Sequence, residues 1–360
     1  MEKNFRHLEA LGFNHWFQDR IDSTKASDCQ IARVITVTKE NYVIRNGKND
    51  ALAVLTGKLR FNADSPLDYP TVGDWVYAVS SDDDSLAIIP EILPRKTILT
   101  RKTAGKRVKI QLIAANIDIA FIVQSVDYNY NLRRLERYLA MINAAHIRPI
   151  VLLSKSDLLS PSDVEEKVAG IREGMPNLQI VAFSNKSNSG LPQIIELLVP
   201  NETYCLLGSS GVGKTTLLNN LLGEALFETQ PIREKDGKGR HTTTRRQLST
   251  LKNGAMLIDT PGMKEMGNFG TESGINETFD EIAELSTQCR YNDCSHTQEK
   301  GCAVLAALQN GTISQERYQN YERMNNESAH YKMSYLEKRR KDKQFDKLCK
   351  SVMKHKTKHK

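Results

Sequence analysis

The sequence lacks the long apolar run that a membrane-spanning helix requires. No segment approaches the roughly 20 consecutive apolar residues needed to cross a bilayer, and the N-terminus mixes charged with scattered apolar side chains, unlike a secretory signal. Cysteine is also scarce: six residues in 360, without the regular spacing of a disulfide framework. We therefore expect a soluble, cytoplasmic, monomeric protein that has no disulfides and no membrane partner.

Most of the chain lacks a net positive charge. Between Tyr331 and Lys360 there are twelve Lys or Arg and three Asp or Glu, a net charge of +9, which leaves −2 for the remainder of a chain whose total is +7. A concentrated basic tail favours a polyanionic partner through counterion release. The tail, residues 331–360, is therefore either an arm that contacts RNA or only a solubilising end.

The first hundred residues predict a short helical extension followed by a small β-barrel. Residues 1–28 contain one amphipathic pattern. Residues 29–100 contain five short runs rich in Val, Ile and aromatic residues, namely IARVITVT, YVIRN, ALAVLTGKL, GDWVYAV and SLAIIPEIL. Five such strands fit an oligonucleotide-binding (OB-like) barrel that contacts RNA. A barrel that acts only as a spacer is the alternative.

Strand and helix patterns alternate over residues 101–270. Asn131 is positioned to cap the helix that follows IDIAFIVQS, and Ser162 with Glu165 resembles the capping box of a second helix. Apolar runs such as PIVLLS and TYCLL then alternate with further helical patterns. This order predicts a doubly wound, parallel α/β sheet whose ligand loops share the carboxyl edge of the strands. Residues 271–330 predict a helical domain.

One glycine-rich segment has the pattern of a phosphate-binding P-loop. It matches G-x-x-x-x-G-K-[ST], follows an apolar strand and opens a helix, so its amides would converge on phosphates. Lys214 would reach the β- and γ-phosphates and Thr215 would bind Mg²⁺. The predicted phosphate-binding residues are Gly208, Ser209, Ser210, Gly211, Val212, Gly213, Lys214, Thr215 and Thr216.

A DTPG turn, Asp259 to Gly262, ends the apolar strand AMLI. In a P-loop protein, an aspartate in this position holds Mg²⁺, usually through water, and a following glycine N–H contacts the γ-phosphate. We therefore expect Asp259 in the magnesium site and Gly262 at the γ-phosphate.

Ser154, Lys155, Ser156 and Asp157 resemble the guanine motif N-K-x-D. The carboxylate of Asp157 would accept two N–H bonds from the guanine edge, a donor pair that adenine lacks, and the stem of Lys155 would cover the ring. Ser154 replaces the usual Asn, so the side-chain amide that braces neighbouring loops is lost. Ser184, Asn185 and Lys186 fit a companion loop that binds the guanine oxygen through backbone N–H groups.

The guanine motif precedes the P-loop, which reverses the familiar order. In a doubly wound sheet all binding loops emerge at one edge, so the site depends on which strands are adjacent and not on their order in the chain. A circular permutation of the domain therefore preserves the site.

Guanine motif, companion loop, P-loop, GRHTTT (Gly239 to Thr244) and DTPG, in this order, resemble the circularly permuted, small-subunit-dependent GTPases of bacterial ribosome biogenesis. The resemblance implies three parts: an OB-like barrel, an α/β P-loop GTPase domain with permuted motifs, and an α-helical domain that contains zinc. It also implies hydrolysis of GTP with Mg²⁺, stimulated by the small ribosomal subunit and its rRNA, as a late maturation checkpoint.

The resemblance also assigns roles to residues outside the P-loop. Cys289, Cys294, His296 and Cys302 offer three thiolates and an imidazole, which suits structural Zn²⁺, although the spacing alone leaves unlinked cysteines open. His241 would position the attacking water, because Met263 stands where a Gln would orient it; a solvated loop residue is the alternative. Thr244 would sense the γ-phosphate and Mg²⁺.

Two other functions are compatible with these motifs. One is a P-loop ATPase or kinase with an accessory RNA-binding domain. The other is a non-catalytic RNA-binding scaffold that nucleotide only stabilises. Competition between GTP and ATP, and the effect of small subunits on phosphate release, separate these alternatives from the GTPase.

Overall fold

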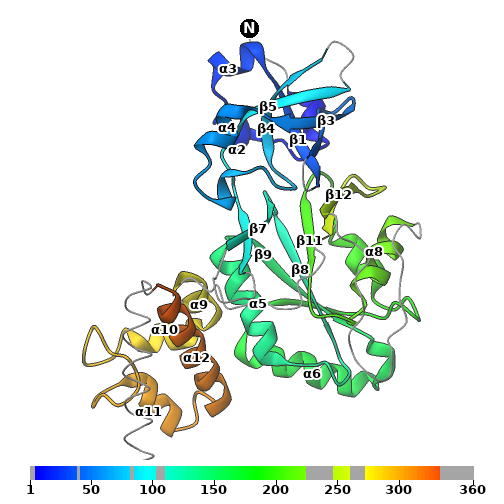
Figure 1. Cartoon of the computed structure of the whole chain (residues 1–360). Helices are drawn as coiled ribbons and strands as arrows, with labels where there is room; N and C mark the ends of the chain where they lie inside the picture. The colour runs from blue at the N-terminus through cyan, green and yellow to red at the C-terminus, as the bar shows by residue number, and fades with distance from the viewer. Residues whose placement is uncertain are drawn as a thin grey trace, which may run out of the picture. The chain divides into compact units, whose positions relative to one another are not determined.

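The computed structural model describes residues 5–38, 41–81, 85–102, 110–223, 246–259 and 272–332. The chain forms two compact units, Met1–Phe269 and Gly270–Lys360 (Figure 1). None of the helices in the described ranges combines the length and apolar character needed to span a bilayer.

Five strands form a closed barrel, as the sequence predicts. They are β1 (Gln30–Val37), β2 (Tyr42–Arg45), β3 (Asp50–Leu55), β4 (Trp75–Ser80) and β5 (Leu86–Ile92). They pair in the order β1, β2, β3, β5, β4, and pairing of β4 with β1 closes the barrel. The third run ends earlier than predicted, because Thr56 caps the helix α4 (Gly57–Asn62) by accepting from Leu59 N. The turn η1 (Pro66–Asp68) precedes β4.

The N-terminal segment forms three short helices, whereas the sequence predicts one. They are α1 (Arg6–Glu9), α2 (His15–Gln18) and α3 (Ser23–Asp28). The chain turns between the first two at Gly12, whose φ of 83° and close approach to Asn201 O leave no room for a side chain. The apolar side chains of this segment pack against Trp75 on the barrel. The extension therefore forms a second apolar cluster with the barrel strands, distinct from the cluster that fills the barrel.

A second set of strands forms the predicted α/β sheet. The strands are β8 (Ile119–Ser125), β9 (Arg148–Ser154), β10 (Gln179–Ala182), β11 (Thr203–Leu207), β12 (Arg246–Thr250) and β13 (Met256–Asp259). Strands β10, β9, β8, β11 and β13 lie in this order and are parallel, which confirms the prediction. Strand β12 is antiparallel to β13 and was not predicted, nor was the hairpin of β6 (Ile98–Lys102) and β7 (Ile110–Ala115).

Helices cover both faces of this sheet. Leucines and other apolar residues of α5 (Leu132–Ala144) and α6 (Pro161–Gly174) share one core with β8 and β9. Those of α7 (Leu191–Glu196) and α8 (Lys214–Leu222) share the core on the other face. Asn131 caps α5 as predicted, but α6 is capped by Ser160 and not by Ser162, because Pro161 occupies its first position.

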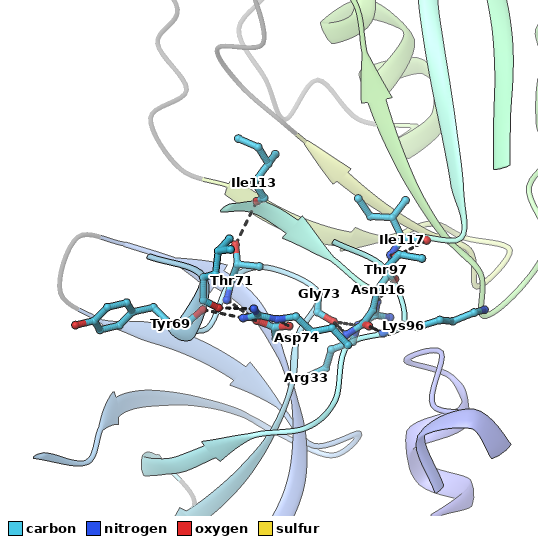
Figure 2. Close-up of polar contacts among 12 residues, drawn as sticks. Arg33, Tyr69, Thr71, Gly73, Asp74, Lys96, Thr97, Ile113, Asn116 and Ile117 are labelled. Carbon is cyan, nitrogen blue, oxygen red and sulfur yellow. Dashed lines mark hydrogen bonds and ion pairs between the residues drawn. The ribbon is translucent and has the colours of Figure 1, made fainter. Parts of the chain in front are cut away.

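The barrel and the α/β sheet are continuous. Strand β1 pairs with β12, so eleven strands form one sheet. Arg33 of β1 is buried at this seam, where it donates to Thr203 Oγ1 at 2.8 Å, Asn116 O at 3.3 Å and Gly73 O at 3.4 Å. Figure 2 shows Arg33 next to Gly73 and Asn116. The seam therefore fixes the barrel on the domain that carries the P-loop.

Four helices form the described part of the second unit: α9 (Glu272–Thr278), α10 (Asp280–Ser286), α11 (Ala303–Gln309) and α12 (Gln315–Lys332). Arg317 of α12 pairs with Glu281 of α10 and donates to Thr278 O at 2.9 Å. The predicted helical domain with a Cys/His loop between α10 and α11 is confirmed.

Candidate nucleotide and zinc sites

The carboxyl ends of five parallel strands gather the predicted nucleotide-binding segments at one edge. The guanine motif follows β9, the companion loop follows β10, the P-loop follows β11 and Asp259 ends β13. Strand β8 lies between β9 and β11, so the loop after β8 is adjacent to both the guanine motif and the P-loop. Segments far apart in sequence thus meet at one site.

The P-loop has the backbone that phosphate binding requires. Gly208, Gly211 and Gly213 all have positive φ angles of 141°, 77° and 94°. A Cβ at Gly208 would lie 2.2 Å from Val123 O, so only glycine fits. Lys214 Nζ donates to Gly208 O at 2.8 Å and Ser209 O at 2.6 Å. The N-terminus of α8 follows at Lys214 and favours an anion.

One buried hydroxyl of the P-loop has no partner among the described residues. Ser209 Oγ is inaccessible and makes no hydrogen bond within them. A buried polar atom without a partner is costly, and a phosphate oxygen would satisfy it. The loop therefore fits a phosphate in both its backbone and its side chains.

The guanine motif is connected to the companion loop through Asp157. Lys155 has a left-handed backbone (φ 62°) and begins the turn η2 (Ser156–Leu158), which contains Asp157. Ser184 Oγ donates to Asp157 Oδ1 and accepts from Lys186 N at 3.0 Å. Ser184 therefore orients the carboxylate and also orders the companion loop.

Ser154 keeps a contact between the guanine motif and the P-loop, although the sequence predicts that this contact is lost with the usual Asn. Its buried hydroxyl donates to Val212 O in the P-loop at 2.6 Å. Asn185 Nδ2, from the companion loop, donates to Gly213 O at 3.1 Å. The amide of the usual Asn is absent, but the Ser154 hydroxyl and the Asn185 amide join the guanine-binding loops to the phosphate-binding loop.

Sequence analysis missed Asp127 and Asn129, in the loop after β8. Asp127 Oδ2 lies 2.8 Å from Lys155 Nζ, and Asn129 Nδ2 donates to Ser210 O of the P-loop at 3.2 Å. Burial alone would raise the pKa of Asp127, but hydrogen bonds from Lys155, Ser125 and Asn129 N outweigh it and hold that pKa below its ordinary value. Both residues follow β8, the strand between β9 and β11, and this position in the predicted sheet is the signal that could have identified them.

Thr215 lies in the first turn of α8 beside Thr216. Asp259 ends β13, whose Ile258 pairs with Cys205 of β11, the strand that leads into the P-loop. These positions are compatible with oxygen ligands to Mg²⁺ at the phosphates. His241, Thr244, Gly262 and Met263 lie outside the described residues, as does the tail beyond Lys332.

Cys289, Cys294, His296 and Cys302 offer four ligand atoms that all lie within 4.8 Å of one another. The Nδ1 atom of His296 is 3.4 Å from Cys302 Sγ and 3.6 Å from Cys289 Sγ. Three thiols and one imidazole match tetrahedral Zn²⁺, and four protein ligands leave no position open for water. The site is therefore a structural zinc site that joins the end of α10 to the start of α11.

Neighbouring groups fix the zinc ligands. Tyr318 of α12 donates its hydroxyl to His296 O at 2.6 Å, and Cys302 caps α11 by accepting from Leu305 N. Glu299 accepts from the backbone of Ser295 at 2.8 Å and Thr297 at 2.9 Å, on either side of the histidine. These hydrogen bonds shape the loop before a metal enters.

Comparisons with known proteins agree with this geometry. Residues 92–269 match the family model described as RsgA GTPase. The small ribosomal subunit biogenesis GTPase RsgA 2 of Vibrio parahaemolyticus is 38% identical over 351 residues, 98% of this chain and 94% of the relative. That of Opitutus terrae, RsgA, is 39% identical over 90% of each chain.

A solved structure of YjeQ from Thermotoga maritima superposes with a TM-score of 0.63 at 26% identity, covering 84% of this chain and 99% of that one. These relatives do not favour an ATPase or a kinase. With its guanine motif ahead of its P-loop, the chain belongs to the RsgA GTPase family and is a P-loop enzyme that hydrolyses GTP.

Proposed function

We propose that this GTPase binds the small ribosomal subunit and hydrolyses GTP to GDP and phosphate as a late maturation checkpoint and release switch. The names of its relatives, small ribosomal subunit biogenesis GTPases, support this partner. The observation that carries the nucleotide site is a chain of contacts: Asp157 meets Ser184, and the adjacent Asn185 reaches the P-loop at Gly213. One nucleotide can thereby contact the guanine motif and the phosphate cradle together.

The base is recognised by the guanine motif and the companion loop. Asp157 accepts the two guanine N–H groups, and the Lys155 stem covers the ring. Ser154 and Ser156 hold this turn next to the P-loop. The backbone N–H of Asn185 binds the guanine oxygen, because the N–H groups of Ser184 and Lys186 already donate to Ser189 O and Ser184 Oγ and so fix the shape of the companion loop. Because adenine presents an acceptor where guanine presents a donor, ATP leaves the carboxylate unpaired.

The triphosphate is bound by the P-loop, Gly208 through Thr216. Lys214 stabilises charge that develops on the β- and γ-phosphates, and Gly262 contacts the γ-phosphate. Thr215, Thr244 and Asp259 would hold Mg²⁺, which would neutralise phosphate charge. His241 orients the attacking water in the complex with the partner. Turnover without a partner is therefore slow, since Met263 cannot orient water.

The remaining parts contact RNA. We assign the barrel (residues 29–100), the zinc domain (271–330) and the basic tail (331–360) to the ribosomal surface. The extension (1–28) supports the barrel, and residues 101–270 form the GTPase domain. The protein acts as a cytoplasmic monomer with no membrane partner.

Phosphate release tests the proposal. Purified protein should hydrolyse GTP slowly and ATP at background, and small ribosomal subunits should accelerate GTP hydrolysis at least tenfold, whereas large subunits should not. Equal rates with and without small subunits would refute the ribosomal role. Equal use of ATP would refute the guanine site. Lys214→Ala, which removes the phosphate-binding ammonium, is the inactive control.

A further inference from the structure

The carbonyl groups of a phosphate-binding loop need partners of their own. When the amides of the loop converge on a phosphate, its carbonyls point away and must find donors elsewhere. In this chain Ser210 O, Val212 O and Gly213 O accept from Asn129 at 3.2 Å, Ser154 at 2.6 Å and Asn185 at 3.1 Å. Three consecutive strands of the sheet contribute one donor each: Asn129 and Asn185 lie in the loops after β8 and β10, and Ser154 is the last residue of β9.

The donors are themselves held in place. Arg134 donates to Asn129 Oδ1 at 2.8 Å, which points the Asn129 amide nitrogen at the P-loop. Asn220 of α8 donates to Asn185 Oδ1 at 3.1 Å with the same effect. Ser154 is fully buried. The orientation of each donor is therefore set before a nucleotide binds, which lowers the cost of ordering the cradle on binding.

We propose that Asn129 and Asn185 are positioning residues for phosphate binding, and that the Asn185 amide supplies the brace that the guanine motif gives up by having Ser154. This inference rests on the proposed nucleotide site. Both asparagines act through the P-loop carbonyls, so they set phosphate affinity. Asp157 and the backbone of the companion loop set the choice of base.

Asn185 lies where a residue would have to lie to replace the contact that the usual Asn of the guanine motif makes with the P-loop. Its Nδ2 atom lies 2.9 Å from where a Cβ on Gly213 would stand, so it packs directly on the residue before Lys214. Ser154 reaches only the preceding carbonyl, at Val212. Loss of Asn185 would leave Gly213 O with only its helical donor, Leu217 N at 3.0 Å, while Lys214 and Asp157 keep their own contacts.

The test measures GDP and GTP dissociation constants for Asn185→Ala and Asn129→Ala. Each should weaken both nucleotides roughly 3- to 10-fold, the effect of one hydrogen bond, and raise KM with kcat unchanged. The preference for GTP over ATP and the melting temperature without nucleotide should stay as in the parent protein. Asn177→Ala, an exposed asparagine in the turn before β10, is the matched control.

Rescue distinguishes positioning from general damage. Ser154→Asn restores the usual amide next to the P-loop, so Ser154→Asn combined with Asn185→Ala should recover most of the lost affinity. The inference would be overturned if Asn185→Ala and Asn129→Ala bound nucleotide within twofold of the Asn177→Ala control. It would also be overturned if they lost the preference for GTP over ATP as strongly as they lost affinity, or if Ser154→Asn gave no rescue. Failure of the parent protein to bind GTP at all would instead refute the proposed function.

Discussion

Lys155 and Asp127 form an ion pair with 2.8 Å between Nζ and Oδ2, and this pair joins the guanine motif to the loop after β8. Both side chains are largely buried, so water screens the pair less than a surface pair. The same loop reaches the P-loop through Asn129. The position of Lys155 over the base therefore depends on a residue outside the guanine motif.

Asp127→Asn should weaken GTP binding by roughly 3- to 10-fold, because Lys155 loses the charge that positions it. Equilibrium binding of a fluorescent GDP measures the loss. Asp163→Asn, on the exposed face of α6, is the control and should change nothing. Unaltered affinity in Asp127→Asn would show that Lys155 holds its place without the pair.

The pH dependence of this pair follows from the lowered pKa of Asp127. A carboxyl group whose pKa is lowered by folding stabilises the folded state above its ordinary pKa of 3.8, and this contribution is lost as pH falls through the lower, folded value. Between about pH 5 and 8 the Asp127 carboxyl group is fully ionised. GDP binding by the parent protein and by Asp127→Asn should therefore differ by a constant factor across this range.

Asp157→Asn should exchange the base preference of the enzyme. The two guanine N–H groups need two acceptor oxygens, but an amide offers one acceptor oxygen and one NH₂ donor. GTP binding should therefore fall roughly 100-fold. Xanthine carries a carbonyl in place of the amino group of guanine and can accept from that amide. Competition among GTP, XTP and ATP measures the change. A variant that still prefers GTP would show that another residue chooses the base.

The sequence predicts the parts of the site whose chemistry is local. The P-loop glycines need positive φ angles, so the pattern alone identifies the P-loop. The four zinc ligands lie within one short loop, but their spacing leaves unlinked cysteines open, and the family resemblance is needed to assign them. Asp127 and Asn129 were missed because they contact the motifs only through the order of β9, β8 and β11 in the sheet. The pairing of β12 with β1 joins residues about 210 positions apart and leaves no local signal.

Arg33→Met should destabilise the barrel seam. Burial lowers the pKa of Arg33 to about 10, yet the side chain stays charged at neutral pH and satisfies Thr203 Oγ1 and the carbonyls of Gly73 and Asn116. Its loss removes the guanidinium donor from Thr203 Oγ1 and Asn116 O, while Gly73 O keeps Asn116 Nδ2 at 3.0 Å, so the free energy of unfolding should fall by about 3 kcal/mol or more.

Urea unfolding monitored by tryptophan fluorescence measures this loss, since Trp75 lies beneath the Arg33 guanidinium. Arg172→Met, at an exposed position of α6, is the control and should be near neutral. A free energy of unfolding that is unchanged in Arg33→Met would mean that the seam repacks around the apolar side chain.

Glu299→Gln should speed the loss of zinc from the Cys/His site. Hydrogen bonds from the Ser295 hydroxyl and from the backbone of Gln298 and Ser295 lower the pKa of Glu299 to about 2, so the carboxylate is ionised at pH 7. A glutamine has only one acceptor oxygen, and its NH₂ group is a donor that would face N–H groups that are donors themselves. The loop that carries His296 should therefore loosen, and zinc affinity should fall about tenfold.

The rate of zinc transfer to a chromogenic chelator at pH 7 measures this loss, and the equilibrium reached with the chelator measures the affinity, both without reference to GTP hydrolysis. Glu284→Gln, at an exposed position of α10, keeps the same change of charge without touching the loop and should release zinc at the parent rate. Equal rates for the two variants would show that Tyr318 and the cap at Cys302 hold the ligands by themselves. Faster release from Glu299→Gln alone would assign the shape of the metal loop to its carboxylate.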